Sequence, residues 1–251
     1  MQKYYDSIAG TKSFCHRDFV RYNQDVGLIE KNTPVLNNLS YWLSEGGVEN
    51  DDIILHNYKM ISNLILKNYG IEYIILYKKF LNDNPDEIKY GISMKNFVAV
   101  NKFIKDNIEI ENTINDKDTL TYKVSENIYS NVYLNIGKNW YPVERDNEDV
   151  LTRIIDKNNA TIIINNLDNI PHKIVFTYRA KSFQIHPSRQ MDVFLNDEFL
   201  GIHTALSYFN DLGFPALTLK PGKNTIKFYI RDIDESQNNV IIKDIWYNQF
   251  E

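Results

Sequence analysis

Acidic residues recur at an Asp-x-Asp spacing, first at Asp116 and Asp118 and again at Asp232 and Asp234. Two carboxylates so spaced can hold a divalent metal ion, as enzymes that use nucleotide sugars require. The first pair directly precedes a segment with a strand pattern, so we interpret Asp116 and Asp118 as turn residues. Neither pair is therefore assigned a catalytic role.

Calcium is the other metal that the acidic residues could bind, because it prefers hard oxygen ligands that two loops can supply. Asp232 and Asp234 are the candidate ligands of such a structural ion. The neighbouring Glu235 and an earlier acidic segment with Asp146, Glu148 and Asp149 could complete the site. The alternative is that all of these side chains lie in solvated loops.

Other catalytic motifs are absent from the sequence. It contains neither the Gly-x-Ser-x-Gly turn of a serine nucleophile nor a glycine-rich phosphate loop. Its five histidines never stand four residues apart, as a helical zinc pair would. Cys15 and His16 are adjacent, so in an extended strand they face opposite ways. We therefore predict no catalytic residue in this chain.

Aromatic residues offer a different chemistry, the recognition of a sugar. The sequence has 17 Tyr and 13 Phe. A flat ring can contact the C–H face of a sugar while fixed polar groups bond its hydroxyls, although most such rings fill a core instead. The segment 207–214 offers both kinds of side chain in a predicted loop. Its candidate ligand-binding residues are Tyr208, Phe209, Asn210, Asp211 and Phe214.

Strands must position that segment, because the helical period disappears after Ser130. Apolar and polar residues alternate in short runs, and Pro221-Gly222 provides turn chemistry. The pattern predicts an antiparallel β-sandwich of the jelly-roll kind, as in carbohydrate-binding modules. The predicted strands are 132–136, 140–143, 160–165, 173–179, 190–195, 199–203, 216–219, 225–231 and 240–247.

The first half alternates helix and strand. Apolar residues at helical spacing predict a helix that ends at Gly70 and a second one around 97–104. The apolar run 71–77 predicts a central strand covered on both faces, and 120–124 predicts another strand. This order favours a small α/β domain with a right-handed crossover. We therefore predict an α+β protein of two domains, 1–127 and 128–251.

Charge and hydropathy limit the kinds of partner that the protein can have and the places where it can be located. A net charge of −5 argues against nucleic acid, whose phosphates need clustered Lys and Arg. No run of about 18 apolar residues is present, and the N-terminus lacks the apolar core of a signal peptide. The chain is then either intracellular or a soluble piece of a larger protein. The glycosylation patterns at Asn38 and Asn159 agree weakly with an extracellular location.

Several segments resemble the soluble exoplasmic region of polytopic archaeal and bacterial membrane glycosyltransferases related to the protein mannosyltransferases. They are Leu66-Lys-Asn-Tyr-Gly-Ile-Glu-Tyr-Ile-Ile-Leu-Tyr-Lys78, Asp118-Thr-Leu-Thr-Tyr-Lys-Val124 and Gly137-Lys-Asn-Trp-Tyr-Pro-Val-Glu144. The resemblance implies a location at the outer face of a membrane. It carries over no catalytic residue, because the catalytic carboxylate of such enzymes lies beside transmembrane helices.

These observations favour a non-catalytic soluble module that works with a membrane glycosyltransferase and contacts glycan, lipid-linked sugar or a partner protein. One alternative is a free-standing glycoside hydrolase or transferase. It would place two carboxylates about 5–10 Å apart across a groove. A structural envelope protein is the other alternative. It would expose a large apolar patch and have no groove.

Overall fold

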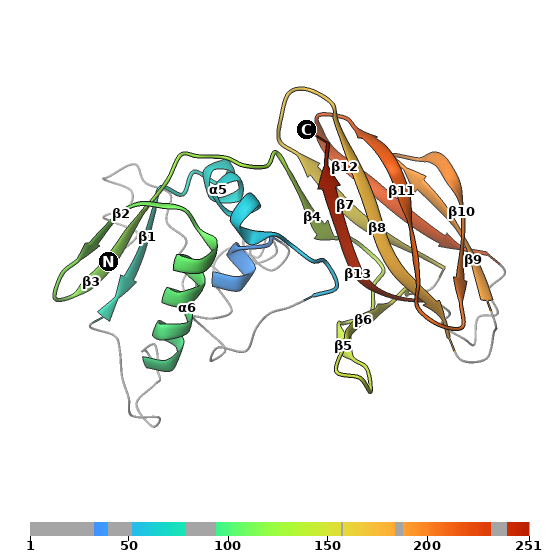
Figure 1. The fold of residues 1–251 in the computed structure, drawn as a ribbon, viewed down its shortest axis with the longest axis horizontal. Helices are drawn as coiled ribbons and strands as arrows, with labels where there is room; N and C mark the ends of the chain where they lie inside the picture. The colour runs from blue at the N-terminus through green and yellow to red at the C-terminus, as the bar shows by residue number, and fades with distance from the viewer. Residues whose placement is uncertain are drawn as a thin grey trace. The chain divides into compact units, whose positions relative to one another are not determined.

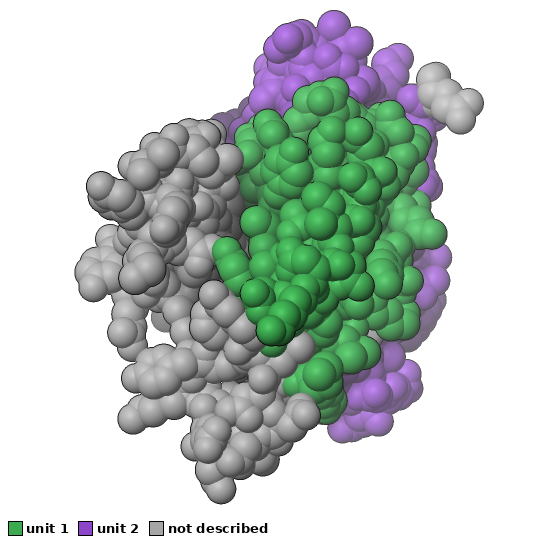
Figure 2. Space-filling model, turned by 90° about the vertical axis from the view of Figure 1, so that its left-hand side faces the viewer, with its two compact units in different colours: residues 1–50, 57–130 green, residues 51–56, 131–251 purple. Residues whose placement is uncertain are grey.

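The computed structural model describes residues 33–39, 52–78, 94–156, 158–183, 188–231 and 240–250. The chain forms two compact units, coloured separately in Figure 2. Unit 1 comprises residues 1–50 and 57–130, and unit 2 comprises residues 51–56 and 131–251. The chain therefore enters unit 2 for six residues, returns to unit 1 and then completes unit 2.

In its described residues, unit 1 contains helices α5 and α6 and a small sheet, besides a helical turn at residues 36–39. Helix α5 buries Ile61, Leu64 and Ile65 on one face, and it ends before Gly70, whose φ of 66° suits glycine. Both predicted helices are thus confirmed. The elements described in unit 1 are α5 (Tyr58–Asn68), β1 (Tyr73–Tyr77), α6 (Met94–Asn107), β2 (Ile110–Asn115) and β3 (Thr119–Val124).

The sheet of unit 1 corrects the predicted crossover. Its order is β1-β3-β2, and all pairs are antiparallel. Strand β2, which was not predicted, forms a hairpin with β3, and the Asp116 carboxylate accepts hydrogen bonds from the backbone of Asp118 and Thr119 in its turn. Asp116 and Asp118 are therefore turn residues, as predicted. Because the hairpin makes β3 the central strand, β1 lies at an edge with Tyr73 and Ile75 exposed.

Unit 2 is built almost entirely of strands. They form one sheet in the order β4-β7-β12-β9-β10-β8-β13-β6-β5, with β11 paired to β8 (Figure 1). The strands are β4 (Val132–Ile136), β5 (Glu144–Arg145), β6 (Leu151–Ile154), β7 (Asn159–Asn166), β8 (His172–Ser182), β9 (Ser188–Leu195), β10 (Glu198–Leu206), β11 (Asn210–Leu219), β12 (Gly222–Ile230) and β13 (Val240–Gln249).

The sheet curls into a sandwich because β10 meets β8 through a single parallel pair, Leu206 with Lys181. Alternate residues on both sides of the curl then point into one core. Phe176, Tyr178 and Phe228 meet at its centre, with the Tyr178 and Phe228 rings 5.0 Å apart and edge to face. The predicted β character of this half of the chain is confirmed, and the finer assignment to a jelly-roll sandwich stays a prediction.

Between β4 and β7 the predicted strands are wrong in two places. Residues 140–143 form no strand beyond one bridge from Trp140 to Ile155, because Pro142 has no N–H group with which to continue the pairing. The Trp140 indole donates a hydrogen bond to the carbonyl of Thr161. The short hairpin of β5 and β6 was missed, since two strands of two and four residues leave no alternation to detect.

A six-residue segment from the first half of the chain completes the sandwich. Ile54 forms a parallel bridge with Ile245 of β13, and Ile53 and Ile54 are 1% and 6% exposed within the core. Asp52 accepts two hydrogen bonds from the guanidinium of Arg153 in β6, the Nε contact at 2.7 Å. The predicted boundary at 127/128 thus omits a part of the sandwich.

Candidate functional site

The described part of unit 2 has a hollow of about 370 Å³ at one end of strand β8. This volume lies within the range of small-molecule sites. Two segments that sequence reasoning considered separately meet here, namely the acidic turn after β5 and the aromatic loop after β10. The lining residues are Asp146, Asn147, Glu148, Lys181, Ser207, Tyr208 and Phe209.

The acidic wall of the hollow is a turn held by its own hydrogen bonds. The Asp146 carboxylate accepts bonds from the backbone N–H groups of Glu148 and Val150, both at 3.0 Å. Asp149 adopts a φ of 60°, and the Arg145 guanidinium donates to its carbonyl at 3.0 Å. The turn therefore presents its carboxylates from a fixed backbone.

Hydrogen bonding also fixes the charge of Asp146. The N–H of Val150, then that of Glu148 and the ammonium groups of Lys181 and Lys243, lower its pKa below the usual aspartate value. Asp146 is consequently ionised at neutral pH. It can accept hydrogen bonds from hydroxyl groups but is a poor proton donor.

The aromatic wall is shorter than the predicted loop. Residues 207–209 connect β10 to β11, and from Asn210 onward the chain is strand. The loop prediction for 210–214 is therefore wrong, because these residues pair in register with β8. The Asn210 amide braces the loop by accepting from the N–H of Leu206 and donating to the carbonyl of Thr204, both at 3.1 Å.

Tyr208 and Phe209 occupy different environments in this loop. The ammonium groups of Lys181 and Lys243 both lie over the Phe209 ring, each 4.4 Å from its centroid. These cation–π contacts occupy the Phe209 ring, which was expected to stack on a sugar. Tyr208 is 63% exposed. It is therefore the aromatic side chain of the hollow that can offer a face to a ligand.

The remaining candidate residues lie on β11, outside the lining of the hollow. Asp211 pairs with Arg179 of β8, with 2.7 Å between the Nε and Oδ1 atoms. Phe214 stacks on the His203 ring at 4.5 Å and packs against the core. Of the five candidates, the structure brings together Tyr208 and Phe209, with Asn210 as their support.

The candidate calcium ligands Asp232 and Asp234 lie outside the described residues. Among the residues that the structure describes, no group of three or more His, Cys, Asp or Glu side chains is placed to hold a metal ion. Asp146 and Asp149 instead serve the turn described above. A structural calcium ion stays a prediction.

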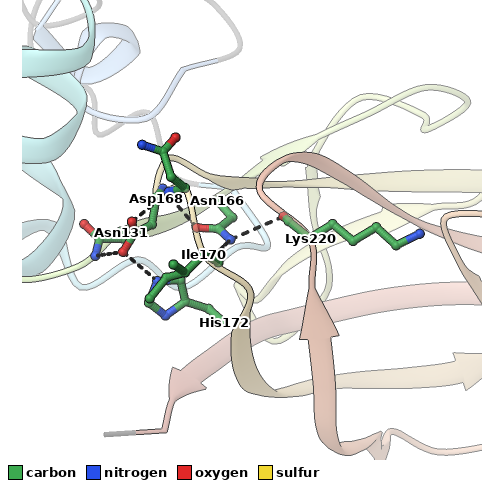
Figure 3. A network of polar contacts seen from close by, with 7 residues as sticks. Asn131, Asn166, Asp168, Ile170, His172 and Lys220 are labelled. Atoms are coloured by element: carbon green, nitrogen blue, oxygen red, sulfur yellow. Dashed lines mark hydrogen bonds and ion pairs between the residues drawn. The ribbon is translucent and has the colours of Figure 1, made fainter.

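The histidines of the described chain take part in packing and hydrogen bonding. Figure 3 shows His172, whose Nε2 lies 3.0 Å from Asp168 Oδ2, an atom that also accepts from Asn131 at 3.1 Å. Nearby, the buried Asn166 amide donates to the carbonyls of Ile170 and Lys220. The structural interpretation is thus confirmed for His172, whereas His16 and His186 lie outside the described residues.

His203 makes the stability of unit 2 depend on pH. Burial lowers its pKa below the usual value near 6.5, and its Nδ1 lies 2.7 Å from the hydroxyl of the buried Tyr178. The folded state then binds fewer protons than the unfolded state, so the contribution of neutral His203 is complete above about pH 6.5 and declines below it. We expect the free energy of unfolding to fall from pH 6.5 downward until the folded-state pKa is passed.

Denaturant unfolding at a series of pH values measures this dependence. His203→Gln, which keeps a hydrogen-bonding side chain but does not titrate, should show a shallower fall than the native protein. His56, whose pKa burial lowers to about 4, titrates in both proteins and cancels in the comparison. Identical slopes for the two proteins would contradict the assignment.

Comparisons with known proteins find likeness in structure alone. No family model matches the sequence, and no curated protein matches it. A family 35 carbohydrate-binding module from Clostridium thermocellum is 14% identical, with 44% of this chain and 90% of that chain covered and a TM-score of 0.31. A family 35 module from an environmental isolate is 15% identical, with 47% and 93% covered and a TM-score of 0.32.

A family 36 module in complex with calcium and xylotriose is 14% identical, with 46% of this chain and 92% of that chain covered and a TM-score of 0.31. These matches cover less than half of this chain at low TM-scores, so they identify neither its family nor its ligand. Within the described ranges, no helix is long and apolar enough to cross a membrane.

Proposed function

We propose that unit 2 is a carbohydrate-binding module whose ligand occupies the hollow between the acidic turn and the aromatic loop. The observation that carries this proposal is the position of the exposed Tyr208 beside fixed polar groups in one hollow. A sugar has an apolar C–H face and a ring of hydroxyls. Tyr208 suits the first, while Asp146, Glu148 and Lys181 suit the second.

Binding fits this hollow better than hydrolysis does. A glycoside hydrolase needs a general acid whose pKa is raised, together with a second carboxylate across the sugar. The hollow takes both of its carboxylates, Asp146 and Glu148, from a single turn, and the pKa of Asp146 is lowered. We therefore assign no catalytic step to these residues.

The association with a membrane glycosyltransferase is a further part of the proposal. Its support is the resemblance of the segments 66–78, 118–124 and 137–144 to soluble exoplasmic regions of such enzymes. In that setting the module would lie at the outer face of the membrane and contact a glycan or a lipid-linked sugar.

Replacing the exposed aromatic ring tests the binding site. Tyr208→Ala should lower affinity for a soluble polysaccharide about tenfold or more, because an aromatic contact contributes roughly 0.5–1.5 kcal/mol beyond its buried area. The melting temperature should change little, since Tyr208 is 63% exposed. Affinity electrophoresis in gels that contain xylan, mannan or β-glucan measures the effect.

Tyr229→Ala is the matched control. Tyr229 is also exposed, at 38%, but it lies on β12 and does not line the hollow. The Tyr229→Ala variant should bind the polysaccharide with the same affinity as the native protein. Equal losses in both variants, or a native protein that no polysaccharide retards, would remove the support for this site.

A further inference from the structure

The outer face of the sandwich beside the hollow carries a row of side chains along β8. Residues of β8 alternate, so Phe176, Tyr178 and Ala180 point into the core while Thr177, Arg179 and Lys181 point outward. Lys181 also lines the hollow. The outward row therefore begins at the hollow, and from Lys181 to Thr177 it runs for about 13 Å.

Neighbouring strands widen this row into a strip. Thr177 pairs with Gly213 of β11 on one side and with Trp246 of β13 on the other. Directly paired residues project from the same face of a sheet, so Trp246 stands on the outer face beside two small residues. A methyl group at Gly213 would lie 2.4 Å from the carbonyl oxygen of Phe176. Strands β11 and β8 can therefore approach each other this closely only because residue 213 is a glycine.

A bulge in β13 gives Trp246 its outward direction. The pairing register of β13 with β8 shifts between Lys243 and Trp246, and Asp244 within the shift has a φ of 48°. With regular alternation from the buried Val240 and Ile242, Trp246 would face the core. The extra residue turns Ile245 inward and Trp246 outward instead. Strained backbone of this kind is frequent at binding sites.

The charges on the strip are paired within it. The Arg179 guanidinium contacts Asp211 Oδ1 at 2.7 Å and Asp244 Oδ2 at 3.3 Å, and it lies 5.8 Å from the centroid of the Trp246 ring. Lys181 and Lys243 lie over Phe209. A surface whose ions already have partners suits a neutral ligand that offers many hydroxyl groups.

We propose that the binding site continues from the hollow along β8 to Trp246, and that its ligand is a neutral linear glycan chain several sugar units long. This inference rests on the proposed function of the hollow. One end of the chain occupies the hollow beside Tyr208. A later unit stacks on the Trp246 ring, which has a single cation over it at 5.8 Å, whereas Phe209 has two at 4.4 Å. The hydroxyls between the two ends bond to the Arg179 and Asp211 side chains.

Calorimetric titration of the full chain with β-1,4-linked xylo-, manno- and gluco-oligosaccharides, from the monosaccharide to the hexasaccharide, tests the strip. For the series that binds, affinity should rise about tenfold or more between the disaccharide and the hexasaccharide. Trp246→Ala should abolish this rise while the disaccharide affinity stays unchanged. Trp246→Phe should keep most of it, because a ring face remains.

Thr177→Lys provides an independent variant, because it fills the strip from an outward position without removing a half-buried ring. It too should abolish the rise with chain length. An affinity that does not depend on chain length, or hexasaccharide binding that neither variant weakens, would contradict the extension of the site along β8. The proposed site in the hollow would not be affected by that result. Absence of binding throughout, or full disaccharide affinity in Tyr208→Ala, would overturn the proposed function and the strip together.

Discussion

A fragment that begins at residue 131 is expected to be far less stable than the same residues together with the segment 51–56. That segment supplies Ile53 and Ile54 to the core, and burying each side chain is worth roughly 1.5–3 kcal/mol. It also supplies Asp52, without which the 16% exposed Arg153 side chain loses its carboxylate partner and keeps, among the described residues, only its hydrogen bond to the carbonyl of Tyr141. The summed loss is about 5 kcal/mol, comparable with the whole stability of many domains.

Denaturant unfolding of two fragments measures this loss. One is residues 131–251 alone, and the other carries residues 51–56 at its N-terminus through a long Gly/Ser linker. The matched control carries the same linker and segment with Ile53 and Ile54 both changed to Ser. We expect the native segment to raise the midpoint strongly and the changed segment to raise it little. Equal midpoints for all three would show that residues 128–251 are a self-sufficient domain, as the sequence predicts.

The strands of the sandwich could be predicted because their residues obey a local rule. In β8 and β12 every second residue is buried, and alternation of this kind is visible in the sequence itself. The Asn196 and Asp197 turn has positive φ at both residues, which Asn and Asp tolerate in two-residue hairpins. Local patterns of this kind predict where a strand lies, but they do not predict which strand it pairs with.

The parts that sequence reasoning missed depend on contacts between distant residues. Ile53 and Ile54 form too short an apolar group to show a period, and only their pairing with Ile245 reveals their place. The same holds for the bulge at Asp244, because a single inserted residue shifts the register without a marker in the sequence.

The candidate site was predictable in one half only. The aromatic loop was found because Tyr208 and Phe209 stand among polar residues. Its partner wall was not, since the turn at Asp146 lies some sixty residues earlier and reaches the loop only through the curl of the sheet. The lysines over Phe209 come from β8 and β13, and this placement changes which ring can contact a sugar.

Asn224 is expected to be the most sensitive polar position of the described sandwich. Its side chain is 0% exposed, and its Oδ1 accepts from the N–H of Lys220 and the Asn196 amide, both at 2.9 Å. Its Nδ2 donates to the carbonyls of Lys220 and Gly222 at 2.8 and 3.1 Å. One amide thus ties the turn after β11 to the turn after β9.

Asn224→Leu should therefore cost about 2–4 kcal/mol of the free energy of unfolding, because it leaves several backbone and amide groups without partners in a buried place. Asn224→Asp should cost at least as much at neutral pH, because it keeps the oxygen that accepts from Lys220 and Asn196 but places a buried carboxylate oxygen against the carbonyls of Lys220 and Gly222. Lys223→Leu, at the exposed neighbouring position, serves as the control for adding an apolar side chain to this turn. Urea unfolding of the three variants decides the matter. If Asn224→Leu were as stable as Lys223→Leu, the two turns would be held by their backbones alone, and the amide would add nothing to them.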